Sequence, residues 1–156
     1  MNYREIKINN NTVNKRLDLI LTQIGKWHNL TPKIWRPEYR VTFEDIQETI
    51  ERIKNTKSED LFLMVAEDNQ GEVKGFIWAN KQEEPQDSIM ILSLYVTEDC
   101  RGQGIATELK KLLEKWCIGK GIKTIQTTTH YNNHSMIELN KKLGYVPGME
   151  DSIIEI

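Results

Sequence analysis

The fold is decided by one stretch of the sequence, IMILSLYVTEDCRGQGIAT at residues 89–107. Its first part, residues 89–96, is apolar at six of eight positions, which is typical of a strand with both faces buried. A turn with two glycines follows, and from Ile105 to Cys117 apolar residues recur at helical spacing. This pattern predicts a central strand that leads through a short turn into an amphipathic helix.

The turn at residues 101–107 has the chemistry of an anion site. At the start of a helix the first N–H groups have no partner within the helix, and the helix dipole adds partial positive charge there. Gly102 and Gly104 let a ligand approach the backbone without interference from Cβ atoms. Together with Arg101 and the Thr107 hydroxyl, these groups predict a cradle for a pyrophosphate. A plain strand-to-helix turn with two glycines is the alternative.

Two other phosphate-binding motifs do not fit this turn. No Gly-Lys-Ser/Thr follows at the required spacing, which excludes a P-loop. The Gly-x-Gly-x-x-Gly motif is incomplete because residue 107 is Thr, which disfavours a dinucleotide-binding fold. Residues 101–123 nevertheless hold six basic and two acidic residues, a local charge of +4.

Composition limits the class of protein. The 156 residues include 21 basic and 23 acidic side chains, a net charge of −2, which argues against a nucleic-acid binder held by phosphate contacts. The length suits a single domain over residues 1–156. Two cysteines, Cys100 and Cys117, are too few for a disulfide framework and fit a reducing cytosol. With neither a signal peptide nor a long apolar stretch, we expect a soluble cytoplasmic protein that binds no membrane.

Periodicity predicts further elements on both sides of this stretch, in the order β α α β β β α β α β, a mixed α/β (α+β) domain. Residues 9–12 offer a helix cap, Gly25 is expected to end the first helix, and Thr42 with Asp45 to form a capping box. Residues 27–40 show no clear period and are expected to form a loop, with or without a short helical turn. The predicted strands are residues 3–8, 61–66, 73–79, 89–96, 123–129 and 152–156, and the predicted helices are residues 13–24, 43–55, 105–117 and 133–143.

Three motifs resemble those of one family. Arg-Gly-Gln-Gly-Ile-Ala at residues 101–106 matches the Gln/Arg-x-x-Gly-x-Gly/Ala signature of the GNAT superfamily of acyl-CoA-dependent N-acetyltransferases. Leu-Tyr-Val at residues 94–96 resembles the end of that family's fourth strand, and residues 133–145 resemble its second motif. The resemblance extends over nearly the whole chain. It implies a central, mixed, mostly antiparallel twisted sheet of about six to seven strands with about four flanking helices.

The resemblance also implies how acetyl-CoA is bound as a co-substrate, without a metal. The coenzyme would lie in a V-shaped gap between the strands at 89–96 and 123–129. Backbone groups near Leu94 and Val96 would pair with its pantetheine arm, which Asn133 would also contact. The pyrophosphate would be held at the turn by Arg101, Gly102, Gln103, Gly104, Ile105, Ala106 and Thr107.

The catalytic groups are less clearly marked. In the resembling family a Tyr seven residues after the Asn often protonates the leaving thiolate, and here that position is Asn140. An amide can hydrogen-bond sulfur but cannot act as an acid, so Tyr131 or Tyr145 are alternatives. His130 is the candidate general base, with Glu67 or a water chain as further alternatives. A surface loop histidine without a catalytic role is the alternative for His130.

Two features concern the acceptor. Trp27, His28, Trp35 and Tyr39 occupy the region that resembles the family's variable acceptor-binding elements, where they would form a wall for an apolar or cationic group. Packing over the core is their alternative role. Residues 67–87 carry six acidic and two basic residues, and three of them, Glu83, Glu84 and Asp87, would attract a cationic amine if they lined the acceptor mouth. A solvated hairpin edge is their alternative role.

The resemblance therefore implies an N-acetyltransferase, an acyltransferase enzyme. It would transfer an acetyl group from acetyl-CoA to a primary amine of a small molecule or peptide, by direct attack in a ternary complex. A catalytically weak or inactive CoA-binding sensor or regulatory protein is the alternative. Family members are often dimers, so a homodimer stays open.

Overall fold

The computed structural model describes residues 1–8, 14–34, 36–129, 133–147 and 151–155. These residues form one seven-stranded sheet in the order β1-β2-β3-β4-β5-β7-β6. Only β4 and β5 pair in parallel, so the sheet is mixed and mostly antiparallel as expected. The strands are β1 (Asn2–Glu5), β2 (Leu61–Glu67), β3 (Val73–Gln82), β4 (Ser88–Val96), β5 (Thr124–Thr128), β6 (Val146–Pro147) and β7 (Asp151–Glu155), and the α-helices are α1 (Lys15–His28), α2 (Phe43–Asn55), α3 (Ile105–Lys120) and α4 (His134–Lys142).

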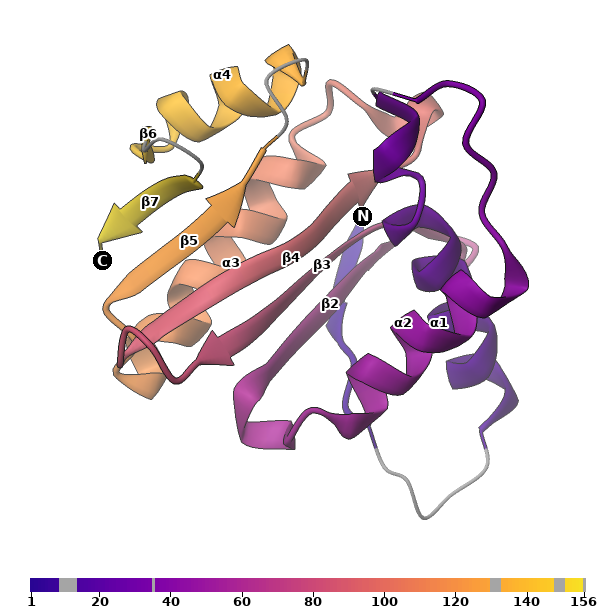
Figure 1. The fold of residues 1–156 in the computed structure, drawn as a ribbon, viewed down its shortest axis with the longest axis horizontal. Helices are drawn as coiled ribbons and strands as arrows, with labels where there is room; N and C mark the ends of the chain where they lie inside the picture. Colours follow the sequence, from indigo (N-terminus) through magenta and orange to yellow (C-terminus); the bar gives the residue numbers. More distant parts are fainter. Residues whose placement is uncertain (9–13, 35, 130–132, 148–150, 156) are drawn as a thin grey trace.

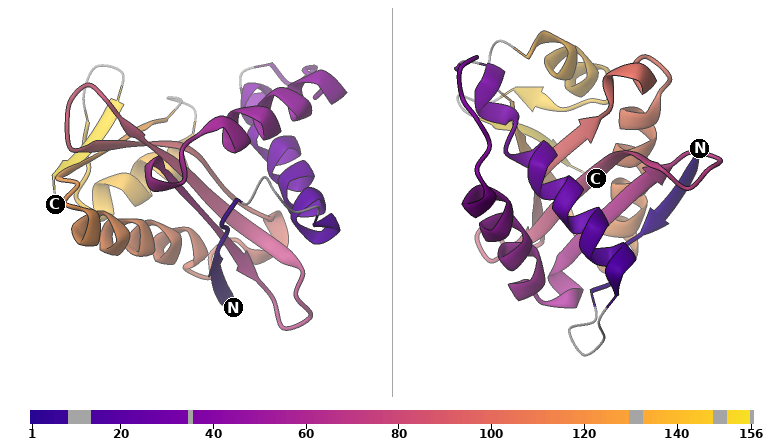
Figure 2. Two further views of the ribbon diagram at one scale, coloured as in Figure 1. Left: turned by 90° about the horizontal axis from the view of Figure 1, so that it is seen from below. Right: turned by 90° about the vertical axis from the view of Figure 1, so that its right-hand side faces the viewer.

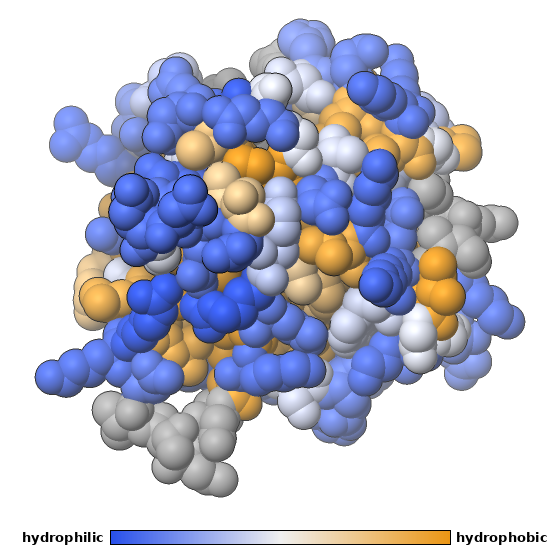
Figure 3. All heavy atoms as spheres, turned by 180° about the vertical axis from the view of Figure 1, so that it is seen from behind, coloured by the Kyte–Doolittle hydropathy of each residue, from blue (hydrophilic) through white to orange (hydrophobic). Residues whose placement is uncertain are grey.

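The sheet separates two layers of helices. Helices α1 and α2 cover one face, and α3 and α4 cover the other (Figures 1 and 2). Each layer encloses its own apolar cluster, one built around Leu109 and Leu113 of α3 and the other around Leu21 and Ile24 of α1. Seen from behind, the face that carries α3 shows small apolar patches separated by hydrophilic side chains (Figure 3). Among the described helices, none is both long and apolar enough to cross a membrane.

Helix ends follow local capping chemistry. The capping box predicted at Thr42 is present, because the Thr42 hydroxyl accepts from the Asp45 N–H and the Asp45 carboxylate accepts from the Thr42 N–H. Helix α1 begins after Asn14, whose side chain accepts from the Leu17 N–H. The cap expected at residues 9–12 lies outside the described residues. The observed cap, Asn14, comes two positions later.

The expected end of α1 at Gly25 is wrong. The helix continues to His28, because Gly25 serves close packing rather than termination. A Cβ atom added at Gly25 would lie 2.9 Å from Ile46 Cγ2 and 3.2 Å from the Ile46 carbonyl oxygen. The missing side chain therefore lets α1 approach α2. As a consequence, Trp27 and His28 belong to the last turn of α1 and not to a loop.

The predicted order of elements is confirmed, with small differences at the edges. The first strand covers Asn2–Glu5 rather than residues 3–8, although the Ile6 N–H still donates to the Leu63 carbonyl. The short strand β6 was not predicted, since two residues carry no periodic signal; it pairs with β7.

Candidate functional site

Strands β4 and β5 separate halfway along β4. Their parallel pairing runs from Ser88 with Thr124 to Ile91 with Thr127. Beyond Ile91, β4 continues for five residues to Val96, without a partner on that side among the described residues. Figure 1 shows the two strands diverging toward their arrowheads. The two strands therefore separate as expected, and the gap named below is the space between their unpaired ends.

A β-bulge lies at the point where the strands separate. Trp78 pairs with Ser93 but Ala79 pairs with Ile91, so Leu92 is an extra residue in β4. A bulge bends its strand and increases the local twist. This distortion turns the second half of β4 away from β5.

The backbone of β4 presents polar groups to the gap. The Thr97 N–H donates to the Lys74 carbonyl at the start of β3. In an antiparallel pair, successive residues direct their N–H and C=O groups alternately toward the partner strand and away from it. The N–H and C=O groups of Leu94 and Val96 consequently point away from β3, toward the gap.

The glycine turn follows β4 after Thr97 and a short 3-10 helix at Glu98–Cys100. Gly102 and Gly104 have φ angles of +80° and +82°, in the left-handed region. A Cβ atom added to either glycine would have no neighbour within 4 Å, so both face open space. The first hydrogen bond of α3 runs from the Glu108 N–H to the Gly104 carbonyl. The N–H groups of residues 105–107 therefore have no acceptor within the helix.

The other side chains of the turn differ in exposure. Gln103 is exposed, Ala106 and Thr107 are half-buried, and the Ile105 side chain belongs to the core. Ile105 can therefore offer only its backbone to a ligand. Arg101 is tied to β4, since its Nε donates to the Val96 carbonyl at 2.9 Å and its guanidinium lies 5.4 Å from the centre of the Tyr95 ring. This contact fixes the base of the turn against the strand.

Asn140 is enclosed rather than open to the gap. Its side chain is 1% exposed. Its Oδ1 accepts a hydrogen bond from Lys110 Nζ, and its Nδ2 donates to Thr129 Oγ1 at 3.1 Å. Both ends of the amide are therefore occupied. Asn133 caps α4, because its Oδ1 accepts from the Met136 N–H. His130 and Tyr131 lie outside the described residues.

Burial changes the pKa of three groups on or beside α3. Desolvation lowers the pKa of Lys110 to about 8, against a smaller opposing effect of Glu114. Desolvation also raises the pKa of Cys117 to about 12. It raises the pKa of Tyr145 as well, with Glu114 adding to the effect. Tyr145 thus holds its proton tightly, which makes it a poor acid for a leaving thiolate.

The residues expected on the acceptor side are only partly brought together. The Trp27 ring stacks on Tyr95 at 5.0 Å and on Phe76 at 6.0 Å between ring centres. His28 meets the Trp78 ring edge-on at 5.2 Å, and burial lowers the pKa of its imidazole, with Arg52 adding to the effect. These two side chains cover the sheet on the α1 face.

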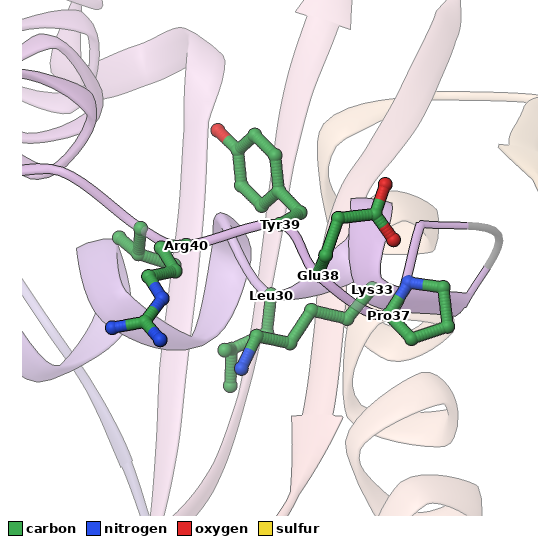
Figure 4. Close-up of a pocket in the computed structure, with 7 residues that line it drawn as sticks. Leu30, Lys33, Pro37, Glu38, Tyr39 and Arg40 are labelled. Carbon is green, nitrogen blue, oxygen red and sulfur yellow. The ribbon is translucent and has the colours of Figure 1, made fainter.

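Tyr39 lies apart from that aromatic group. Its hydroxyl donates to Asp45 Oδ2 at 2.9 Å, and this hydrogen bond is the main reason that the pKa of Tyr39 is raised. It also lines a pocket of about 540 Å³ in the connection between α1 and α2 (Figure 4). Trp35 lies outside the described residues. The pocket is lined by Leu30, Lys33, Pro37, Glu38, Tyr39, Arg40 and Val41.

The acidic hairpin does not line the gap. Residues 83–87 join the end of β3 to the start of β4, whereas the gap lies at the other end of β4. Eight steps of roughly 3.3 Å per residue put Val96 about 26 Å from Ser88. The idea of an acidic acceptor mouth at Glu83, Glu84 and Asp87 is therefore wrong. Local sequence charge cannot tell which end of a strand a loop occupies.

Glu67 is already engaged by two arginines. Its Oε1 accepts from Arg4 at 2.6 Å and its Oε2 accepts from Arg16 at 3.2 Å. A carboxylate held in this way is a weak candidate for a general base. No cluster of three or more His, Cys, Asp or Glu side chains suited to a metal ion occurs within the described part of the chain.

Sequence reasoning missed Lys110 and Thr129. A signal for Lys110 existed, since at 100° per residue it lies roughly 20° from Cys117 around the helix, next to the apolar face. A lysine on such a boundary is ordinarily read as solvated. In the fold, Asn140 of α4 and the Tyr145 ring lie against it. Nothing in the sequence distinguishes Thr129 from its neighbours.

Comparisons with known proteins agree with this geometry. The family model of the acetyltransferase (GNAT) family matches residues 26–145. A curated relative, the L-2,4-diaminobutyric acid acetyltransferase of Vibrio parahaemolyticus, is 32% identical over 82 residues, which are 52% of this chain and 45% of that protein. The chain thus matches less than half the length of this relative.

Solved structures share the fold at low identity. A GNAT acetyltransferase from Staphylococcus aureus has a TM-score of 0.70 at 12% identity, with 99% of each chain covered. A putative acetyltransferase from Acinetobacter baylyi has a TM-score of 0.73 at 15% identity, covering 99% of this chain and 93% of that one. The PaiA N-acetyltransferase of Thermoplasma acidophilum, solved with coenzyme A, has a TM-score of 0.64 at 18% identity, covering 99% and 98%. The match of the family model over most of the chain, on a fold that these structures share, shows that the chain belongs to the GNAT family of acetyltransferases.

Proposed function

We propose that this chain transfers the acetyl group of acetyl-CoA to a primary amine, by direct attack of the amine within a ternary complex. One observation carries the proposal. The open edge of β4 and the exposed glycine turn lie consecutively at one end of a single strand, in a member of an acetyltransferase family.

Coenzyme A fits the residues present. Its pyrophosphate needs hydrogen-bond donors that it can approach closely. The turn offers the N–H groups of residues 105–107, and no heavy atom lies within 4 Å of where a side chain at Gly102 or Gly104 would begin. The N–H and C=O groups of Leu94 and the N–H of Val96 can pair with the amides of the pantetheine arm, with Asn133 as a further contact, whereas the Val96 C=O already accepts from Arg101 Nε.

The chemistry requires an amine without its proton, a stabilised oxyanion and a tolerated thiolate. The amine nitrogen attacks the thioester carbonyl carbon, and the oxyanion that forms needs a donor. A β4 N–H near Val96 that points into the gap is suited to this role. The C–S bond then breaks, and the electron pair leaves with sulfur. His130 is proposed as the general base that accepts the proton of the amine.

The acceptor is proposed to be a small amine. The curated relative is named for the acetylation of L-2,4-diaminobutyric acid, so amino acids with a second amino group are the first compounds to test. Trp27 and His28 on the α1 face, together with Tyr39, are proposed to border the acceptor. A cytoplasmic location belongs to the same proposal and is supported by two free cysteines, Cys100 and Cys117.

Release of the CoA thiol from acetyl-CoA tests the proposal. The panel contains 2,4-diaminobutyrate, lysine, spermidine, an aminoglycoside and a peptide with a free N-terminus, and mass spectrometry identifies acetylated products. We expect release that depends on one class of amine and saturates with it. Tight CoA binding without release of the thiol for any amine would overturn the proposed acetyltransferase in favour of a CoA-binding sensor. Absence of CoA binding would overturn both hypotheses.

A further inference from the structure

Three polar side chains form a buried chain of hydrogen bonds behind the gap. Lys110 on α3 is 1% exposed and donates to Asn140 Oδ1 on α4. Asn140 is equally buried, and its Nδ2 donates to Thr129 Oγ1 at 3.1 Å. The chain therefore links α3 through α4 to the end of β5.

The direction of these hydrogen bonds is fixed by Lys110. An ammonium group has donors only, so it must face the oxygen of the Asn140 amide. The amide nitrogen then has to face Thr129, whose hydroxyl oxygen accepts. A hydroxyl that accepts still has its own hydrogen to donate, and no described residue takes it. Within the described part of the structure, the chain of hydrogen bonds consequently ends in an available donor.

The hydrogen-bond chain Lys110–Asn140–Thr129 lies at the level of the gap. Thr129 follows β5 two residues after Thr127, the last residue paired with β4, and so is expected on the same face as Thr127. Helix α3 starts at the end of β4 and runs back along it. Lys110 lies five residues into α3, roughly 7.5 Å along its axis, which corresponds to about two residues of strand. Lys110 therefore lies at about the level of Leu94 along β4.

Lys110 is a charge without a close counter-ion among the side chains that the structure describes. No carboxylate among the described residues lies within ion-pair distance of its Nζ. Its neighbours are the Tyr145 ring, 4.3 Å from Nζ, and Glu114 one turn further along α3, which acts only at longer range. Burial lowers the pKa of Lys110 to about 8, so the group is still mostly protonated at pH 7. A buried cation of this kind favours an anion placed near it.

We propose that the chain Lys110–Asn140–Thr129 stabilises the thiolate that leaves acetyl-CoA, with the Thr129 hydroxyl donating to sulfur and Lys110 fixing the polarity of the chain. This inference rests on the proposed function. Thr129 is then a catalytic residue, and Lys110 and Asn140 are positioning residues. When the C–S bond breaks, its electron pair stays on sulfur, which accepts the Thr129 hydrogen bond. No proton passes along the chain, and the thiolate is protonated by water on release.

Titration of the bound CoA thiol tests the proposal without an amine acceptor. The thiolate is followed by its ultraviolet absorbance, and the same titration with desulfo-CoA is subtracted. In the wild type we expect the pKa of the bound thiol to lie about one unit below the ordinary value of about 8.5. Lys110→Met and Thr129→Val should remove this lowering. The matched control is Lys111→Met, which removes an exposed charge next to Lys110 and should change nothing.

Asn140→Asp separates this role from a merely structural one. A carboxylate at residue 140 can pair with Lys110 and preserve the packing, so a structural role predicts an unchanged thiol. The proposed chain predicts the opposite. The carboxylate has no hydrogen to give, so Thr129 must turn its own hydrogen toward residue 140 and away from sulfur. We expect a folded variant, verified by thermal unfolding, in which the thiol pKa rises as in Thr129→Val.

The outcomes distinguish this inference from the proposed function. If the bound thiol has the same pKa in wild type, Thr129→Val and Asn140→Asp, the role of the hydrogen-bond chain Lys110–Asn140–Thr129 is overturned and the proposed acetyltransferase activity is unaffected. Failure of the wild type to bind CoA would overturn both. If Lys110→Met does not fold, the other two variants decide the question.

Discussion

Replacing Gly104 by Ala should weaken coenzyme A binding and leave the fold in place. Gly104 adopts a φ of +82°, and a Cβ atom there would meet nothing within 4 Å. The fold therefore loses only the conformational preference of glycine. An L-residue in the left-handed region costs roughly 1–2 kcal/mol, which corresponds to a fall in Tm of roughly 2–8 °C for a domain of this size.

The effect on the ligand is larger. The added methyl group would stand where a phosphate must approach the N–H groups at the start of α3. A hydrogen bond to a charged group contributes roughly 1.5–3 kcal/mol, so loss of one such bond should raise the Kd of CoA roughly tenfold to a hundredfold. Isothermal titration calorimetry gives the Kd, and thermal unfolding gives the cost to the fold.

Gly121→Ala is the matched control. Gly121 has a φ of +73°, and a Cβ atom there also meets nothing within 4 Å, but the residue ends α3 instead of beginning it. Both variants should lose similar stability, and only Gly104→Ala should lose affinity for CoA. An equal Kd for CoA in the two variants would refute the assignment of the turn as a phosphate site.

Three further predictions concern packing, capping and pH. Gly25→Ala should lower the free energy of unfolding in urea, because overpacking against Ile46 costs about 1–3 kcal/mol and outweighs the gain of up to about 1 kcal/mol in helix propensity; a more stable variant would contradict the packing at 2.9 Å. Thr42→Ala should cost about 1 kcal/mol through loss of the capping box, and an unchanged urea midpoint would count against it. Burial lowers the pKa of Lys110 to about 8 in the folded chain, against the ordinary lysine value of 10.5. Between these pH values the unfolded chain therefore binds more protons, and stability rises with pH. The difference in unfolding free energy between wild type and Lys110→Met should therefore rise by up to about 3 kcal/mol across this window, and a constant difference would be incompatible with a buried Lys110.

Much of the fold could be predicted because its signals are local. The apolar run of β4, the two glycines of the turn and the capping box at Thr42 each depend on a few consecutive residues, and the structure has all of them. The role of Gly25 was predicted wrongly because a glycine that ends a helix and a glycine used for close packing have the same local sequence pattern. Only the neighbouring Ile46 separates the two roles.

The site was less predictable because its contacts are between distant residues. Asn140 was singled out by its position in a motif, but its partners Lys110 and Thr129 lie 30 and 11 residues away. The acidic loop at residues 83–87 was misplaced because charge along the sequence carries no information about which end of the sheet a loop occupies. Trp27 and His28 were assigned to a loop because the helix was ended too early.

Amide hydrogen exchange with and without acetyl-CoA tests the central claim most directly. If the coenzyme lies in the gap between β4 and β5, exchange should slow at residues 92–96 and 102–107 and stay unchanged in the loop at residues 83–87, at the opposite end of β4. Slowing at residues 83–87, without any at the glycine turn, would contradict the account.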